Sequence, residues 1–220
     1  MLKHRPPAQQ AGLSLVEFLV AIGVSMLVLL LAMQMYTDML TGNRRTLQES
    51  VLNSAIRDSM SLMTRDIKRA GYWATAEKST SDPSSGRTAT SNPYQAVTQS
   101  SSTILYSYAK DSDATLESNE SFGFRVSGGV LQYQTSSGTW TDITPAGSIE
   151  VTGLTIASAS STTQAPWLCS RLCTGASCPS VTSRAYTITL AMRLRSDTAI
   201  SRSAQTTVRV RSDLPNGACS

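Results

Sequence analysis

One carboxylate, Glu17, lies inside an apolar run that is otherwise long enough to cross a bilayer. The run extends from Leu13 to Met33 and, at 1.5 Å per residue, a helix of this length spans roughly 31 Å. An isolated carboxylate in lipid costs on the order of 2.5–3.5 kcal/mol, so such a residue normally has a partner. Because the run contains no cation, we expect the partner of Glu17 to come from outside this helix.

The four cysteines are a second set of reactive groups. In an exported chain, four cysteines favour two disulfides, and their connectivity is open among three arrangements. We prefer a bond from Cys169 or Cys173 to Cys178, with the remaining cysteine holding Cys219. A zinc site is the alternative, but the spacing matches no common zinc ribbon, and the one histidine, His4, is far away.

Two charged groups could bind ligands. The first is acidic and could hold calcium, but its spacing is not that of an EF-hand, so a solvated loop is the preferred interpretation. The second is basic, and its parity places it on the outward face of the last two strands, where it could contact DNA phosphates or an acidic partner. Solubilising or subunit contacts are more common for such arginines. The acidic group consists of Asp111, Asp113, Glu117 and Glu120, and the basic group of Arg193, Arg195, Arg209 and Arg211.

No pattern typical of catalysis is present. The sequence has no Ser-His-Asp or Cys-His arrangement, no glycine-rich phosphate loop and no metal motif. The net charge of +4 falls by two if Lys3 and Arg5 are removed, which is too mild to imply nucleic acid by itself. We therefore expect a protein that is not an enzyme and has no cofactor.

Helical periodicity extends from Leu13 to about Ala70. After a polar transition at 36–43, where Gly42 could bend the chain, an apolar stripe resumes at steps of three or four, and Gly71 follows as a helix stop. Charged residues fall mainly on the other faces. The stripe contains Leu47, Val51, Leu52, Ala55, Ile56, Met60, Met63, Ile67 and Ala70, and the charged residues are Arg57, Asp58, Arg65, Asp66, Lys68 and Arg69.

Alternating residues predict a β-rich head after the helix. Glu77–Gln99 reads as a surface loop, and Gly128-Gly129 as a two-residue hairpin turn. The pattern indicates an α+β fold, a long N-terminal helix packed on an antiparallel sheet. Strands are expected at Thr103–Tyr108, Ser121–Ser127, Val130–Thr135, Thr139–Ile143, Ile149–Ala157, Tyr186–Leu194 and around Val208 and Val210.

The start of the chain resembles the prepilin signal of type IV pilins and type II secretion pseudopilins. Residues 12–17 read Gly, Leu, Ser, Leu, Val, Glu, with Leu13 where the family usually has Phe. An ordinary secretory signal fits poorly, since its small residues would follow the apolar region. The resemblance implies a type IV pilin-like fold, cleavage after Gly12 by a prepilin peptidase, and N-methylation of Leu13. Glu17 could then meet the amino terminus of a neighbouring subunit, a pair costly to break.

Arg65–Trp73, which reads RDIKRAGYW, resembles the segment that closes the first helix of PilW-type minor pilins. This implies a minor pilin that primes assembly near the tip of a pilus and supports adhesion, twitching motility or DNA uptake. Its partners would be other minor and major pilins, in the inner membrane and then on the cell surface. A J-type secretion pseudopilin is a close alternative, and a membrane-anchored binding module that never polymerises is another. The expected parts are a leader at 1–12, an apolar helix at 13–40, an amphipathic helix at 41–71 and a head at 72–220.

Overall fold

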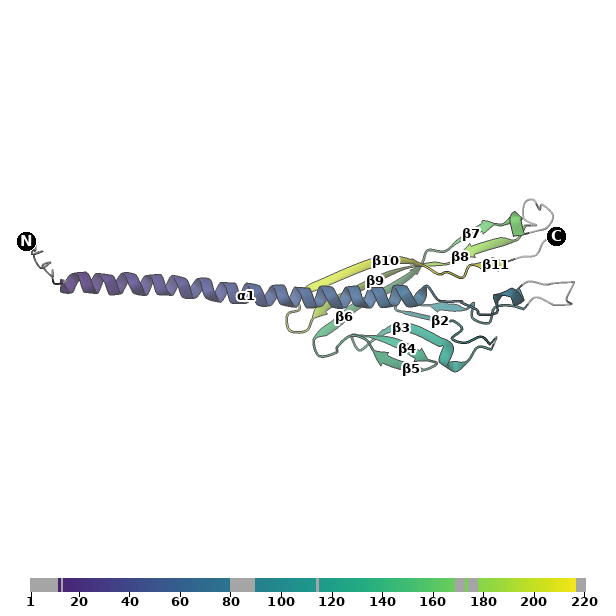
Figure 1. Cartoon of the computed structure of the whole chain (residues 1–220), viewed down its shortest axis with the longest axis horizontal. Helices are drawn as coiled ribbons and strands as arrows, with labels where there is room; N and C mark the ends of the chain where they lie inside the picture. The colour runs from purple at the N-terminus through teal and green to yellow at the C-terminus, as the bar shows by residue number, and fades with distance from the viewer. Residues whose placement is uncertain are drawn as a thin grey trace, which may run out of the picture. The chain divides into compact units, whose positions relative to one another are not determined.

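The computed structural model describes residues 12, 14–79, 90–113, 115–168, 173 and 178–216. It contains one long helix, α1 (Leu15–Ile67), followed by antiparallel sheets (Figure 1). This arrangement confirms the predicted α+β class with a long N-terminal helix. The chain divides into two compact units, residues 1–48 and 49–220, which we describe one at a time.

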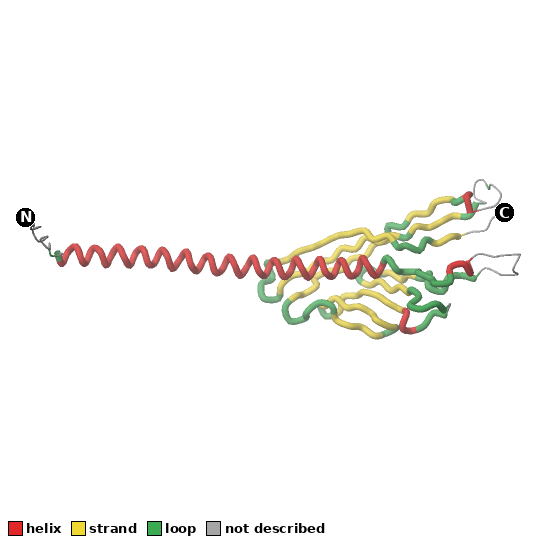
Figure 2. The backbone as a smooth tube through the Cα atoms, in the orientation of Figure 1, coloured by secondary structure: helices red, strands yellow, loops and turns green. Residues whose placement is uncertain are grey.

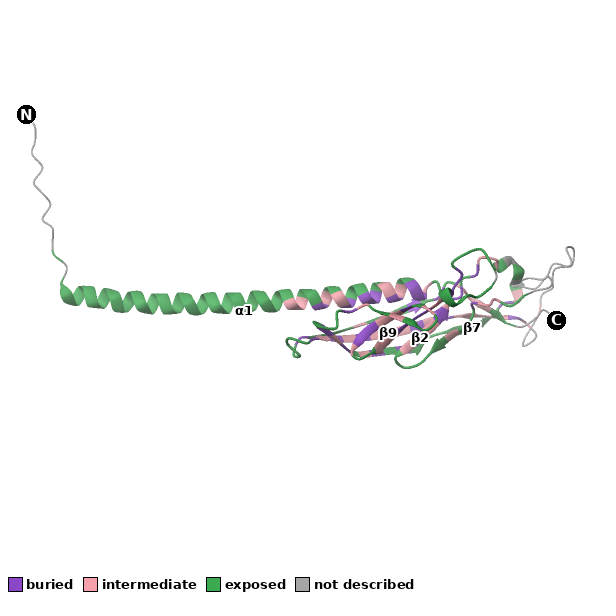
Figure 3. Cartoon of the chain, turned by 90° about the horizontal axis from the view of Figure 1, so that it is seen from below, coloured by how far each residue is buried: buried purple, intermediate pink, exposed green. Residues whose placement is uncertain are grey.

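The first unit contains the apolar part of α1. Every described side chain from 14 to 47 is exposed (Figure 3). Hydroxyl groups in this segment donate to carbonyls of the preceding turn, as Ser25 does to Ala21 at 2.7 Å and Thr41 does to Thr37 at 2.7 Å. Such bonds satisfy polar groups that would otherwise be costly in an apolar environment. The helix passes through Gly42 without interruption, so the expected bend is wrong (Figure 2).

In the second unit, α1 buries one face. The stripe that is buried begins at Leu52, while Val51 stays 54% exposed. Asp66 is also buried, at 7% exposure, although the sequence placed it among the solvated charges. The helix ends at Ile67, and Gly71 follows with φ +74°, a conformation that favours glycine. The buried stripe consists of Leu52, Ile56, Met60, Met63 and Ile67, as the spacing predicted.

The first sheet has five strands in the order β1-β2-β3-β4-β5, each antiparallel to its neighbours. Gly128 and Gly129 join β3 to β4 with φ of +58° and +73°, which confirms the predicted two-residue turn. The short helix η2 (Ser118–Glu120) precedes β3. The strands are β1 (Val97–Gln99), β2 (Thr103–Ser107), β3 (Ser121–Ser127), β4 (Val130–Ser136) and β5 (Thr139–Asp142).

The second sheet, in the order β10-β9-β6, carries the clearest alternation of the chain. It consists of β6 (Ile149–Ser158), β9 (Ala185–Leu194) and β10 (Ser201–Arg209). Alternate residues of β9 are buried, as predicted, because a strand directs successive side chains to opposite faces. Val208 is buried within β10, whereas Val210 follows the strand and is also fully buried.

A third sheet was not predicted. It has the order β11-β8-β7 and consists of β7 (Ser161–Gln164), β8 (Ser180–Ser183) and β11 (Leu214–Asn216). These strands are short, and β7 and β8 consist mainly of Ser and Thr, so the sheet carries no apolar alternation. The single predicted sheet is therefore three sheets. The short helix η3 (Pro166–Leu168) lies between β7 and β8 in the sequence.

The expected surface loop at 77–99 is only partly a loop. Its described residues include the end of the short helix η1 (Ala76–Ser79) and all of β1. Tyr94 within this stretch is fully buried and packs with Trp73 and Ala109 in a small cluster. Trp73 folds back onto the head as expected, while Tyr72 remains 55% exposed.

One apolar core joins α1 to the first two sheets. In Figure 1, the second half of α1 has β9 and β10 on one side and β3, β4 and β5 on the other. Residues of all three parts contact one another in the core, so the amphipathic half of α1 holds the two sheets together. The core includes Leu52, Ile56 and Met63 of α1, Ile104, Phe124 and Leu131 of the first sheet, and Ile156, Ile188 and Leu190 of the second.

Candidate functional site

The candidate processing segment begins just before α1. Gly12 and Ser14 are not helical, and the first helical bond joins the N–H of Phe18 to the carbonyl of Ser14 at 3.1 Å. Leu13, the predicted methylation site, and the rest of the predicted leader lie outside the described residues. The structure therefore places the predicted cleavage position, Gly12, in an exposed, non-helical stretch.

Gly12 is not required by the fold of the described part of the chain. A Cβ atom added at this position would meet no heavy atom within 4 Å, and its φ is not positive. By contrast, a Cβ on Gly71 would lie 2.5 Å from the guanidinium of Arg184. The described residues therefore supply no steric reason for glycine at position 12.

Glu17 lies in the first turn of α1 and is exposed. Within the described part of the chain its carboxylate has no ion-pair partner. A negative charge in the first turn interacts favourably with the helix dipole, which accounts for part of its placement. The neighbouring side chains Val16 and Phe18 are 66% and 60% exposed. By length and composition, α1 contains a stretch that could cross a membrane, and that stretch would carry Glu17.

In the head, a carboxylate and three tyrosines form a cluster that the sequence did not predict. Asp66 of α1 accepts hydrogen bonds from Tyr106 at 2.5 Å, Tyr108 at 3.2 Å and Tyr133 at 2.9 Å. Arg69 lies 3.8 Å from the same carboxylate, and its guanidinium covers the ring of Tyr108 at 4.1 Å. The cluster joins the end of α1 to β2, β4 and the residue that follows β2.

The tyrosines of this cluster stay protonated at neutral pH. Burial, followed by the negative charge of Asp66, raises the pKa of Tyr108 to about 12. The same two causes also raise the pKa of Tyr106 and of Tyr133 above the ordinary value. All three hydroxyls therefore donate to Asp66, and a buried carboxylate with several donors is a structural anchor.

The acidic loop differs from its predicted form, because Glu120 is fully buried. Its carboxylate accepts hydrogen bonds from the hydroxyl of Tyr94 at 2.8 Å and the N–H of Lys110 at 2.7 Å. Asp111 and Asp113 are exposed and accept from N–H groups of their own loop. Among the described residues, no three acidic, His or Cys side chains converge as metal ligands would.

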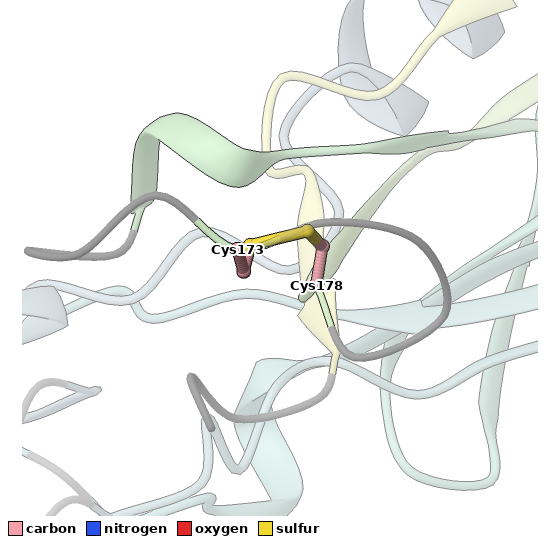
Figure 4. Close-up of a disulfide and its surroundings, with 2 residues drawn as sticks. All are labelled: Cys173 and Cys178. Carbon is pink, nitrogen blue, oxygen red and sulfur yellow. A yellow bond between two sulfur atoms is a disulfide. The ribbon is translucent and has the colours of Figure 1, made fainter.

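The disulfide in the described residues joins Cys173 to Cys178, with 5.3 Å between the Cα atoms (Figure 4). The two cysteines are five positions apart, and both precede β8 in the sequence. It is one of the two pairings that the sequence favoured. Cys169 and Cys219 lie outside the described residues, so their predicted bond stays a prediction.

The four arginines of the predicted basic face separate into two pairs. In the β9–β10 ladder, Arg193 is opposite Ser201, whereas Arg209 is opposite Ala185. Positions 185 and 193 of β9 are eight residues apart, which corresponds to roughly 27 Å along an extended strand. Arg193 forms an ion pair with Glu150 at 2.9 Å. Arg209 forms an ion pair with Asp213 at 2.8 Å. One arginine at each end of the predicted face is therefore neutralised by a carboxylate. The other arginine at each end, Arg195 or Arg211, is exposed.

The sequence contained a signal for the Asp66 cluster. Asp66 follows Met63 by three residues, which places it next to the buried stripe. Tyr106 and Tyr108 alternate on the apolar face of their strand, and a buried tyrosine hydroxyl needs a partner. No comparable signal identified Arg184, which is 5% exposed and donates to the carbonyls of Gln95 and Ser212.

The chain matches the family described as prepilin peptidase-dependent protein B over residues 45–210. The match covers the amphipathic end of α1 and the head as far as the residue after β10. It does not include residues 12–17, so the resemblance of that segment to a prepilin signal is a separate observation. No curated protein and no solved structure matches the chain.

Proposed function

Because the chain belongs to the prepilin peptidase-dependent protein B family, we propose that it is a minor subunit of a type IV pilus. One observation carries this proposal: the apolar first half of α1, exposed along its whole length and with a carboxylate in its first turn, continues into a folded head. Such a helix needs a covering of lipid or of other apolar helices, because exposed apolar surface of this extent is unfavourable in water. An N-terminal apolar helix is compatible with a single-pass inner-membrane anchor before assembly.

In the proposed pathway, a prepilin peptidase cleaves after Gly12, and the new amino group of Leu13 is methylated. The subunit then leaves the membrane, with α1 packing against the helices of other pilins. Glu17 meets the amino terminus of a neighbouring subunit, and this pair sets the register of the two helices. The head is carried to the tip-proximal part of the filament and supports adhesion, twitching motility or DNA uptake.

The proposed role is structural and needs no catalysis. Two buried carboxylates of the head, Asp66 and Glu120, are engaged in hydrogen bonds to tyrosine hydroxyls. The bonds of Asp66 fix the position of α1 against the first sheet. We therefore propose that the protein acts by assembling with other subunits and not as an enzyme.

The test is mass spectrometry of the protein isolated from sheared surface filaments. We expect an amino terminus at Leu13 that carries one methyl group, in a fraction that also contains the major pilin. The J-type pseudopilin would be favoured if the processed protein were absent from surface filaments and were recovered only from cells that have a secretion system. An intact leader on a protein that stays in the inner membrane would contradict both and would favour the non-polymerising anchored module.

A further inference from the structure

A groove with a strongly positive wall lies where α1 ends. It consists of two adjoining hollows of about 450 and 510 Å³, which share Lys68, Arg69 and Arg211. Arg65 lines the first hollow, and Tyr72 and Trp73 line the second. We call this surface the basic groove. All of its residues belong to the second unit of the chain.

Backbone contacts fix the cations of the basic groove in place. The N–H of Arg211 donates to the carbonyl of Lys68 at 3.1 Å, so the segment after β10 is tied to the end of α1. The preceding residue, Val210, is fully buried, and its N–H donates to the carbonyl of Arg184 at 2.9 Å. The side chain of Arg184 in turn bonds to the carbonyl of Ser212 at 3.1 Å. The backbone segments that carry Lys68 and Arg211 are therefore held side by side by the fold of the head.

The charges of the basic groove are not neutralised within the described part of the chain. No acidic residue is among those that line it, and Arg65, Lys68 and Arg211 have no described ion-pair partner. Arg69 is 3.8 Å from Asp66, but that carboxylate is already engaged by three tyrosines. The helix dipole favours cations near the C-terminus of α1, but it does not account for Arg211, which comes from the segment after β10.

The second hollow adds an aromatic surface to the positive charge. Tyr72 is 55% exposed there, next to Lys68 and Arg69. Gly71, Trp73 and Ala76 complete an apolar floor beside the cations. A peptide rich in carboxylates would satisfy the cations but would leave this ring surface uncovered. A nucleotide chain satisfies both, because each phosphate is followed by a planar base.

We propose that the basic groove binds single-stranded nucleic acid. The phosphates lie on Arg65, Lys68, Arg69 and Arg211, and one base stacks on the ring of Tyr72. Grooves that combine cations with an exposed aromatic ring bind single strands with little sequence preference. The site differs from the predicted arginine face, of which it contains Arg211 alone. The inference does not depend on assembly into a filament.

The test uses the full chain in mild detergent and a fluorescein-labelled oligothymidine of about twelve nucleotides, within the usual site sizes for single strands. Binding is followed by fluorescence anisotropy between 50 and 200 mM salt. The double variant Lys68→Gln/Arg211→Gln should lower the affinity at least about tenfold. It should also reduce the slope of log K against log salt by about 1.4, since each phosphate contact on a single strand contributes about 0.7.

The matched control is Arg57→Gln/Arg195→Gln, which changes the same net charge at two exposed residues outside the groove. Because these residues do not line either hollow, the control should change the affinity less than about twofold. Equal losses in the groove and control variants would overturn the proposal, as would the absence of oligothymidine binding at the lowest salt concentration.

Tyr72→Ala separates stacking from charge. It should lower the affinity for oligothymidine by about tenfold and leave the salt slope unchanged, because it removes no charge. All variants should unfold at the wild-type temperature, since the replaced side chains are at least partly exposed. An oligoglutamate peptide of matched length that displaces the oligothymidine at equal concentration would also overturn the proposal and would identify an acidic protein segment as the occupant.

Discussion

The hydroxyl of Tyr133 donates a hydrogen bond of 2.9 Å to the carboxylate of Asp66, which lies 67 positions earlier in the chain. Tyr106 and Tyr108 donate to the same carboxylate, so strands that are separate in sequence converge on one residue of α1. The rings also pack on one another, with 4.0 Å between the centroids of Tyr108 and Phe122. This polar centre within an aromatic layer fixes the rotation of the helix against the first sheet.

Replacing Asp66 by Ala should destabilise the head by about 3 kcal/mol. Three tyrosine hydroxyls would lose a charged acceptor, and a buried donor without a partner costs about 1–3 kcal/mol. The measurement is denaturant unfolding of the full chain in detergent, followed by tryptophan fluorescence. Asp58→Ala is the matched control, because Asp58 lies on the same helix, is exposed and should change stability by less than about 0.5 kcal/mol. Equal effects of the two substitutions would show that the cluster does not anchor the helix.

The stability of the head should fall in alkaline solution. Burial and Asp66 raise the pKa of Tyr108 to about 12 in the folded state, above the ordinary value of 10. A raised folded-state pKa means that this contribution is complete below pH 10 and is lost as the pH rises through about 12. Unfolding free energies measured from about pH 8 to about pH 12 should show the decline. Tyr108→Phe removes the ionisable group, so its decline should be shallower, and an identical decline would contradict this assignment.

Gly12→Val should block maturation and leave the fold intact. A Cβ at position 12 would meet no heavy atom of the described residues within 4 Å, so we expect the effect to arise at the peptidase. On a gel, the variant should run at the size of the full precursor. Gly42→Val is the control, because a Cβ there also meets no atom within 4 Å, and this variant should be processed normally. A Gly12→Val protein of mature size would show that cleavage does not occur as proposed.

Glu17→Ala should be processed but scarce in filaments. Its removal makes the apolar helix easier to insert, so membrane insertion should be unchanged or slightly better. Assembly should fail because a buried ammonium group of a neighbouring subunit would lose its counter-charge. Glu17→Asp should be partly active, since it keeps the charge on a shorter side chain. Immunoblots of sheared filaments and membranes measure the distribution.

Asp38→Ala is the control for Glu17, because it removes an exposed carboxylate from the same helix. It should enter filaments at the wild-type level. If Glu17→Ala protein did the same, the helix would be a plain anchor, and the non-polymerising binding module would become the better interpretation.

Purified protein should contain no free thiol under denaturing, non-reducing conditions. The structure pairs Cys173 with Cys178, which leaves Cys169 and Cys219 as the expected second pair. Peptide mapping without reduction should recover both linkages. Closing a loop of this size contributes about 2 kcal/mol in the chain-entropy treatment, so Cys173→Ser/Cys178→Ser should lose stability of that order. Stoichiometric zinc released by a chelator, together with four reactive thiols, would contradict the disulfide assignment.

The sequence by itself determined the features that repeat locally. The apolar stripe from Leu52 to Ile67 identified the buried face of α1, and the alternation in β9 identified the buried face of that strand. Both could be read from the sequence because the periods of helix and strand are properties of the backbone. Gly128-Gly129 similarly predicted the hairpin turn, since both positions require positive φ. The resemblance of residues 12–17 to a prepilin signal, and the processing and assembly that it implies, were inferred from the sequence alone.

Only the tertiary structure decided which distant residues meet. The sequence predicted Asp66 to be a surface charge, whereas in the structure it accepts hydrogen bonds from tyrosines of β2 and β4. It predicted Glu120 to be solvated, whereas the hydroxyl of Tyr94 donates to its buried carboxylate. The third sheet lacks an apolar alternation, so strand pairing alone defines it. Arg65 and Arg211 are 146 positions apart, and only the packing of the segment after β10 on the end of α1 places them in one groove. Periodicity reports which way a side chain points, whereas its partner depends on the path of the whole chain.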